Sequence, residues 1–229
     1  MAKGTTYFTD DTLAFLRDLS DHNDRDWFNA NKDRYDAHVK EPALRFIMDF
    51  EPHLQRISSH FLADPRPVGG SLFRLHRDVR FSKDKSPYKT HTGIRFPHAR
   101  NKDVHAPGFY LHLEPDEVFT GGGLWHPDPP TTAVVRDAMV ANAREWQSVK
   151  SKLPSGFRIE GDRLSRPPRG YDADHPLIDD LRLKDFTVFT QLDEADACAP
   201  GFLDRFVEIC RASAPFMRFL TEAVGQPWK

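Results

Sequence analysis

The sequence predicts an α+β protein with an N-terminal helical block, a central mainly antiparallel sheet and helices packed on one face of that sheet. Before about residue 62, apolar residues recur every three or four positions, as on the buried side of an amphipathic helix. From Ser71 onward the period changes to two in several segments, which is typical of half-buried strands. The 229 residues contain no internal repeat and no clear linker, so we expect one domain covering residues 1–229.

Three helices are predicted for the N-terminal block. Thr9 is suited to cap the first helix, and three leucines follow it at a spacing of three. Asn23 or Asp24 can cap the second helix, and Pro42 fits the first turn of the third. The proline- and glycine-rich segment "LADPRPVGG" ends the block.

The segments predicted as strands are "SLFRLHRDVRF" (71–81), "HTGIRF", "GFYLHLEP", "VFTGGGLW" and "FTVFTQL". In the first of them Phe73, Leu75, Val79 and Phe81 would share one face. Arg77 falls on that apolar face, so either a bulge breaks the alternation or Arg77 is buried and paired. Helices are predicted after "HPDPP", around 177–183 and at the C-terminus, where Pro215 breaks or kinks the last one.

Composition narrows the class of protein. A net charge of −2 and a pI of about 6.6 argue against a general nucleic-acid binder, so we do not expect nucleic acid as a partner. Two cysteines form neither a disulfide scaffold nor a zinc module. The sequence shows no secretory signal and no apolar run near the roughly 20 residues that span a bilayer, so we expect a cytoplasmic protein without a membrane partner.

A basic stretch, "RDVRFSKDKSPYKTH", interrupts the strand pattern. Between Arg77 and Lys89 five Lys or Arg stand against two Asp. Ammonium groups, guanidinium forks, hydroxyls and loop N–H groups together suit a phosphate or carboxylate. The alternative is a solvated surface loop whose exposed ion pairs contribute little. The predicted ligand-binding residues are Arg77, Arg80, Ser82, Lys83, Lys85, Ser86, Tyr88 and Lys89, together with Trp125.

Polar side chains also share one face of two predicted strands. His76 lies on one strand, and His112 and Glu114 lie on the other. If the strands are neighbours, the three residues form a cluster suited to general acid–base catalysis, and they are our candidate catalytic residues. The alternative is that these polar residues only form the solvent-exposed face of an antiparallel sheet. Their spacing does not match a metal-binding motif, so we expect neither a metal nor another cofactor.

The segment "GGGLWHP" precedes a predicted helix. Its glycines could admit a phosphate to a helix N-terminus, but a bulge or a close backbone crossing is the more common reason for such glycines. Trp125 could support a ligand, although a core position is the default.

Several segments carry a family resemblance: "NDRDWFNANKDRYD", "FRLHRDVRFSKDKSPYKTHTG", "GFYLHLEP", "GGGLWHP", "PRGYDADHP" and "LRLKDFTV". In this order they resemble an uncharacterised family of bacterial and fungal conserved hypothetical proteins, a domain of unknown function. The resemblance covers nearly the whole chain, and "RDVRFSKDKSPYKT" is its most specific part. It implies one domain and draws attention to the basic stretch, but it supplies no reaction, substrate or cofactor.

The leading hypothesis is an intracellular protein that binds a phosphate- or carboxylate-bearing small molecule through the basic stretch. Whether it is an enzyme stays open, as does its oligomeric state. One alternative is an interaction module that docks an acidic protein or a nucleic-acid backbone. Another is a purely structural loop whose charges pin the helices to the sheet.

Overall fold

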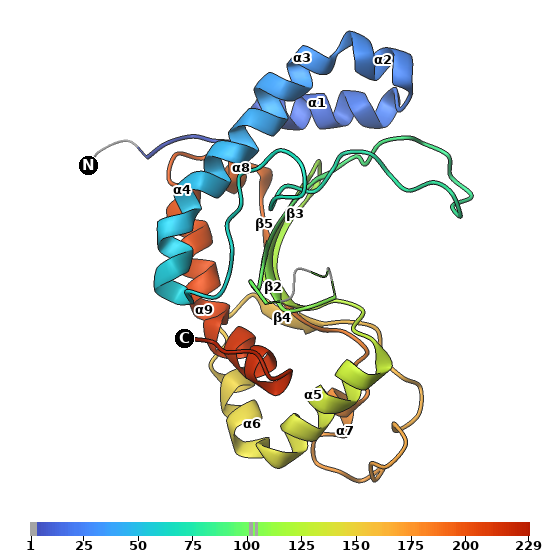
Figure 1. Ribbon diagram of the computed structural model, residues 1–229, viewed down its shortest axis with the longest axis vertical. Helices are drawn as coiled ribbons and strands as arrows, with labels where there is room; N and C mark the ends of the chain where they lie inside the picture. Colours follow the sequence, from blue (N-terminus) through green and yellow to red (C-terminus); the bar gives the residue numbers. More distant parts are fainter. Residues whose placement is uncertain (1–3, 101–102, 104) are drawn as a thin grey trace.

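A five-stranded antiparallel sheet forms the centre of the computed structural model, which describes residues 4–100, 103 and 105–229 (Figure 1). The spatial order of the strands is β1-β2-β3-β5-β4. Their bounds are β1 (Thr92–Pro97), β2 (Gly108–Glu114), β3 (Glu117–Leu124), β4 (Phe157–Glu160) and β5 (Phe186–Leu192). Together with the surrounding helices, this sheet confirms the predicted α+β class.

Helices precede the sheet along the chain, connect some of its strands and follow it. The N-terminal block begins as predicted, because Thr9 caps the first helix and the Asp24 carboxylate accepts from the backbone N–H groups of Asp26 and Trp27, both at 2.9 Å. The helices are α1 (Asp10–Asp21), α2 (Arg25–Ala30), α3 (Lys32–Tyr35), the π-helix η1 (Asp36–Lys40), α4 (Glu41–Ile57), α5 (Pro129–Ala141), α6 (Ala143–Ser151), α7 (Ile178–Leu181), α8 (Glu194–Cys198) and α9 (Phe202–Ala223). Among the described residues, no helix combines the length and the apolar character needed to cross a membrane.

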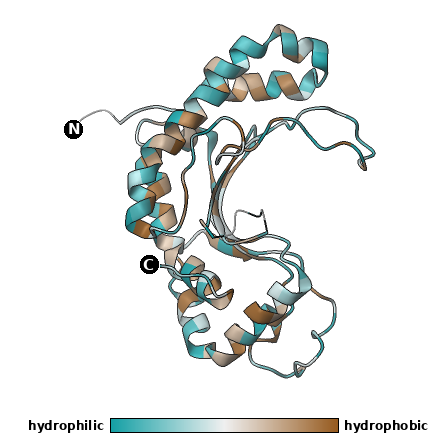
Figure 2. Cartoon of the chain, in the orientation of Figure 1, coloured by the Kyte–Doolittle hydropathy of each residue, from teal (hydrophilic) through white to brown (hydrophobic). Residues whose placement is uncertain are grey.

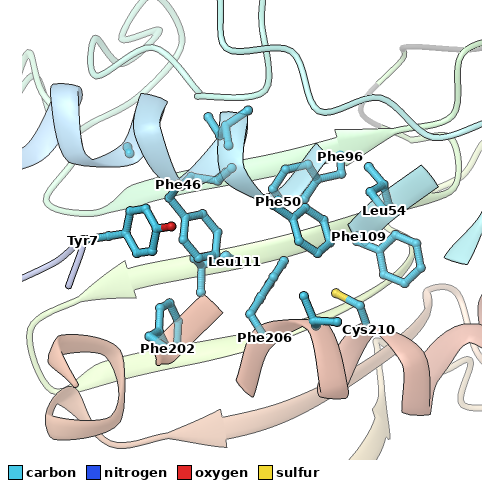
Figure 3. Close-up of a cluster of buried hydrophobic side chains, with 14 of the residues drawn as sticks. Tyr7, Phe46, Phe50, Leu54, Phe96, Phe109, Leu111, Phe202, Phe206 and Cys210 are labelled. Carbon is cyan, nitrogen blue, oxygen red and sulfur yellow. The ribbon is translucent and has the colours of Figure 1, made fainter. Parts of the chain in front are cut away.

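Helices α4 and α9 cover one face of the sheet (Figure 1). Phe50 of α4 lies between the two layers, with ring centroids 4.6 Å from Phe96 of β1 and 4.7 Å from Phe206 of α9 (Figure 3). Phe109 and Leu111 of β2 are fully buried in the same cluster. The packing follows from the period of two, since alternate residues of each strand point toward these helices.

The opposite face of the sheet is concave, and none of the described helices packs across it (Figure 1). Helices α1–α3 lie beyond one end of the sheet, and α5–α7 lie beyond the other. The second and alternate set of side chains on each strand therefore lies on this face, which the described helices leave uncovered.

The strand predicted over residues 71–81 is wrong. Its backbone makes only isolated bridges, between Leu72 and Ile94 and between His76 and Tyr88. The chain folds back on itself, so that Arg77 N donates to the Pro87 carbonyl and Lys89 N donates to the Leu75 carbonyl, both at 2.9 Å. Residues 78–86 form a protruding loop, which we call the loop tip. Figure 2 colours this protruding part of the chain mainly as hydrophilic.

The alternation that predicted this strand fails at the loop tip. Phe81 was expected on a buried face, yet its side chain is 95% exposed. The reason is that a period of two places a residue inward only where a second layer covers the strand, and residues 78–86 have no strand partner in the described chain. Arg77 is neither bulged nor buried: its guanidinium forms an ion pair with Asp84.

Candidate ligand-binding site

A cavity of about 790 Å³ occupies the concave face of the sheet. All five strands contribute to its lining through the side chains that alternate with the core residues. Arg95 of β1 pairs with Tyr110 of β2, Phe119 of β3 pairs with Gln191 of β5, and Arg158 of β4 pairs with Phe189 of β5, and each of these residues lines the cavity. The register between the strands thus determines which side chains lie together on the cavity floor.

Aromatic rings make up much of this floor. The His112 ring stacks on Phe119 with centroids 4.5 Å apart and planes 9° apart. Phe119 meets Phe189 edge-on at 5.2 Å, and Phe73 reaches over from the segment before β1 to lie 6.0 Å from Tyr110. Flat aromatic faces of this kind favour a ligand with a planar or apolar body.

The glycines of "GGGLW" lie inside β3, not at a helix N-terminus. A Cβ atom on Gly121 would be 1.8 Å from the Val188 carbonyl oxygen, and one on Gly123 would be 2.1 Å from the Phe186 carbonyl oxygen. Only glycine lets β3 and β5 approach this closely, so of the two explanations the close backbone crossing is the correct one.

Trp125, at the end of the same segment, is not a core residue as the default expectation had it. Its side chain is 51% exposed and lines the cavity. The ring stacks on His105 with planes 11° apart. An exposed, supported indole can serve as one wall of a ligand site.

A hydrogen-bonded chain of three side chains runs along β2 at the cavity. The Tyr110 hydroxyl lies 3.1 Å from His112 Nδ1, and His112 Nε2 lies 3.1 Å from Glu114 Oε2. The other carboxylate oxygen of Glu114 accepts from the Thr90 hydroxyl. His91 completes the cluster, with Nδ1 3.9 Å from Glu114 Oε2 and a ring centroid 4.4 Å from that of His112.

Burial sets the charges of this cluster. It lowers the pKa of His91 to about 4, with the neighbouring His112 and Lys89 acting in the same direction. Burial also lowers the pKa of His112, although Glu114 opposes the shift. For Glu114 burial alone would raise the pKa, but hydrogen bonds from Thr90 and His112 outweigh it and the pKa is lowered. At neutral pH the cluster therefore holds two neutral imidazoles and one carboxylate.

Lys89 is the cation of the basic stretch that lines the cavity. Its ammonium lies over the Phe73 ring, 5.1 Å from the centroid. Burial, and secondarily Arg74, lowers its pKa. Within the described part of the chain no carboxylate oxygen comes within 4.0 Å of its Nζ. Arg158, by comparison, lies 4.0 Å from Glu160.

The loop tip places its charges elsewhere. Arg77 pairs with Asp84, and Arg80 pairs with Asp78 at 2.7 Å, which lowers the pKa of Asp78 to about 2. Lys85 donates to the Val79 carbonyl at 2.9 Å. Neither Ser82, Lys83 nor Ser86 lines the cavity, and Ser86 donates to Asp84 instead.

Two further predicted site residues lie apart from the cavity lining. Tyr88 is buried against Phe28, with ring centroids 4.4 Å apart. His76 lies against the edge of the Tyr88 ring at 5.0 Å. Of the predicted residues the cavity thus brings together Lys89, His112 and Trp125, with Glu114 hydrogen-bonded to His112.

Sequence reasoning missed several cavity residues. His91 directly precedes β1, and the pairing of Thr92 with Leu113 brings it beside Glu114. Tyr110 alternates with Phe109 and Leu111 in "GFYLHLEP", yet nothing in the sequence was a reason to assign it a role. Phe119 and Phe189 looked like ordinary strand aromatics. The alternation of side chains along each strand predicts which residues share a face. It does not predict which residues of different strands lie side by side, because that depends on the strand register.

Fold and cavity together define an α+β protein with a ligand-sized pocket on the uncovered face of an antiparallel sheet. A family described as conserved hypothetical protein (DUF2461) matches residues 11–219, and the chain belongs to this family. The match confirms the resemblance noted from the sequence. A search of curated proteins finds no match.

Proposed function

We propose that the protein binds, in the cavity on the concave face of its sheet, a small molecule with a phosphate or carboxylate group and a planar apolar body. The observation that carries this proposal is Lys89, a half-buried cation that lines an aromatic cavity without a carboxylate partner among the described residues.

The electrostatic argument concerns solvation. An ammonium group that loses part of its water gains more from a nearby anion than a fully exposed one does. Lys89 meets that condition, whereas Arg80 in the loop tip and Arg77 just before it already have carboxylate partners. Lys89, at the end of the basic stretch, is therefore better suited to bind an external anion than the loop tip is.

The size and lining of the cavity support the rest of the proposal. About 790 Å³ lies within the range of roughly 300–1,000 Å³ that is usual for small-molecule sites. The ring faces of Phe119 and Phe189 would contact the apolar body of the ligand, and Trp125 would cover its side.

A second candidate function, acid–base catalysis on the bound molecule, is favoured by the chain from Tyr110 to Glu114. With its proton on Nε2, His112 donates to Glu114 and accepts at Nδ1 from the Tyr110 hydroxyl. Because the acceptor Nδ1 already faces the Tyr110 hydroxyl, His112 would act as a base through that hydroxyl: Tyr110 would take a proton from the bound molecule as it passes its own proton to Nδ1. Of the predicted catalytic residues, His112 and Glu114 belong to this chain, whereas His76 does not line the cavity.

The binding proposal is tested by thermal shift with phenyl phosphate and benzoate, and with neutral benzyl alcohol for comparison. Both anions should stabilise the wild-type protein and Lys83→Met, which removes a cation from the loop tip. Lys89→Met, which removes the cavity cation at nearly constant side-chain volume, should abolish most of the shift. Equal shifts in Lys89→Met and wild type, or none in wild type, would overturn the proposal.

The cytoplasm is the compartment we propose for this activity. Both cysteines are free, and Cys210 is fully buried, where burial raises the pKa of its thiol. Unpaired cysteines are typical of a reducing compartment.

A further inference from the structure

We propose that His91, His112 and Glu114 form a binding site for a divalent transition-metal ion that faces the cavity. Nothing in the sequence spacing points to such a site, and the proposal replaces the earlier expectation of no metal. It does not depend on the anion proposal, since its ligands are side chains of the protein.

Geometry is the first argument. One potential ligand atom from each of the three residues lies within 4.8 Å of the other two. Glu114 Oε2 is 3.1 Å from His112 Nε2 and 3.9 Å from His91 Nδ1. Ligand atoms around an ion at about 2.0–2.2 Å lie roughly 3.0–3.5 Å apart, so the His112–Glu114 pair already has this spacing and His91 must move closer to complete the set.

The outer contacts of the ligands are the second argument. The Tyr110 hydroxyl lies at His112 Nδ1 and fixes that ring from behind, which leaves Nε2 for an ion. The Thr90 hydroxyl holds the far oxygen of Glu114, which leaves Oε2 facing the two imidazoles. Metal-binding histidines and carboxylates are usually held by partners of this kind.

The chemistry of the donors selects the class of ion. Two imidazoles and one carboxylate suit Zn²⁺, Fe²⁺, Co²⁺ or Ni²⁺ better than Mg²⁺ or Ca²⁺, which prefer oxygen ligands. Three protein ligands leave at least one coordination position open, and His91 and His112 both line the cavity. An anionic group held by Lys89 could therefore also reach the ion.

The metal and the catalytic hydrogen-bonded chain compete for one atom. His112 Nε2 can donate a proton to Glu114 or bind a metal, but not both. In the metal-bound form the proton would sit on Nδ1 and be donated to the Tyr110 hydroxyl. Metal binding would thus replace the general-base role of His112.

The test uses the full chain, freed of metal by dialysis against a chelator and then titrated with Zn²⁺ or Co²⁺ alone by calorimetry and visible absorption. We expect one ion per chain and Co²⁺ ligand-field bands. His91→Ala and Glu114→Gln should each weaken binding by about tenfold or more, while His22→Ala, which removes an exposed imidazole from the N-terminal block, should leave it unchanged. Failure of the wild-type chain to bind, or unchanged affinity in both ligand variants, would overturn the proposal.

A further variant distinguishes a specific metal site from nonspecific metal binding at the protein surface. Tyr110→Phe keeps all three ligands and removes only the outer hydrogen bond to His112. We expect it to weaken Zn²⁺ affinity by about 10–100-fold with its circular dichroism unchanged. The metal titrations contain no anionic probe, so a negative result in them does not bear on the anion-binding proposal. A negative result with phenyl phosphate likewise does not bear on the metal site. Unchanged affinity in Tyr110→Phe would exclude the proposed orientation of His112.

Discussion

The two faces of the five-stranded sheet are built from the same strands but meet different surroundings. On β2, Phe109 and Leu111 are fully buried under α4 and α9, while Tyr110 and His112 face the cavity. The covered face gains stability from ring packing. None of the described helices packs on the open face, so polar and charged side chains can lie there. The contrast shows how one period-two pattern can encode a core and a candidate site together.

The largest effect should come from a truncation on the covered face. Phe109→Ala removes a fully buried ring between β2 and the helices, and we expect it to lower the free energy of unfolding by about 3–5 kcal/mol. Tyr110→Phe, one residue along and on the open face, should cost about 1 kcal/mol through its lost hydrogen bond. Urea unfolding of both variants measures the difference, and similar losses would contradict the contrast between faces.

The next effect concerns the space between β3 and β5. Gly121→Ala places a methyl group against the Val188 carbonyl, so the strands must separate, and we expect a loss of about 1–3 kcal/mol or more. Gly170→Ala is the matched control: Gly170 has a φ of +93° but no atom within 4 Å of the added Cβ. It tests backbone strain without crowding. A larger loss for Gly170→Ala would contradict the close-crossing explanation, and thermal unfolding compares the two.

A smaller effect is expected at the loop tip. Asp84→Asn removes the negative partner of Arg77 and weakens the hydrogen bonds from Ser86. Since this pair is exposed to solvent, we expect the melting temperature to stay within experimental error of wild type. A clear drop in melting temperature would favour the structural alternative, in which the charges of the basic stretch hold the fold together.

Sequence reasoning succeeded where local signals decide structure. Thr9 and Asp24 capped helices as expected, and the alternation in "GFYLHLEP" located β2 with Phe109 on its buried side. It failed at Phe81, because alternation cannot reveal whether a second layer covers the strand.

The same limit applies to the candidate site. Lys89, His112, Glu114 and Trp125 could be singled out from composition and polar patterning. His91 could not, because its place beside Glu114 depends on the register between β1 and β2, which two distant segments settle only when they pair. A count of charges could not predict the ion pairs of the loop tip either.

The central claim is that the concave face of the sheet, and not the loop tip, receives the ligand. Backbone amide chemical shifts of the ¹⁵N-labelled full chain, followed during titration with phenyl phosphate, test it most directly. We predict that the shifts concentrate at Lys89, Tyr110, Phe119 and Phe189. Shifts confined to residues 78–86, or no shifts at all, would contradict the claim.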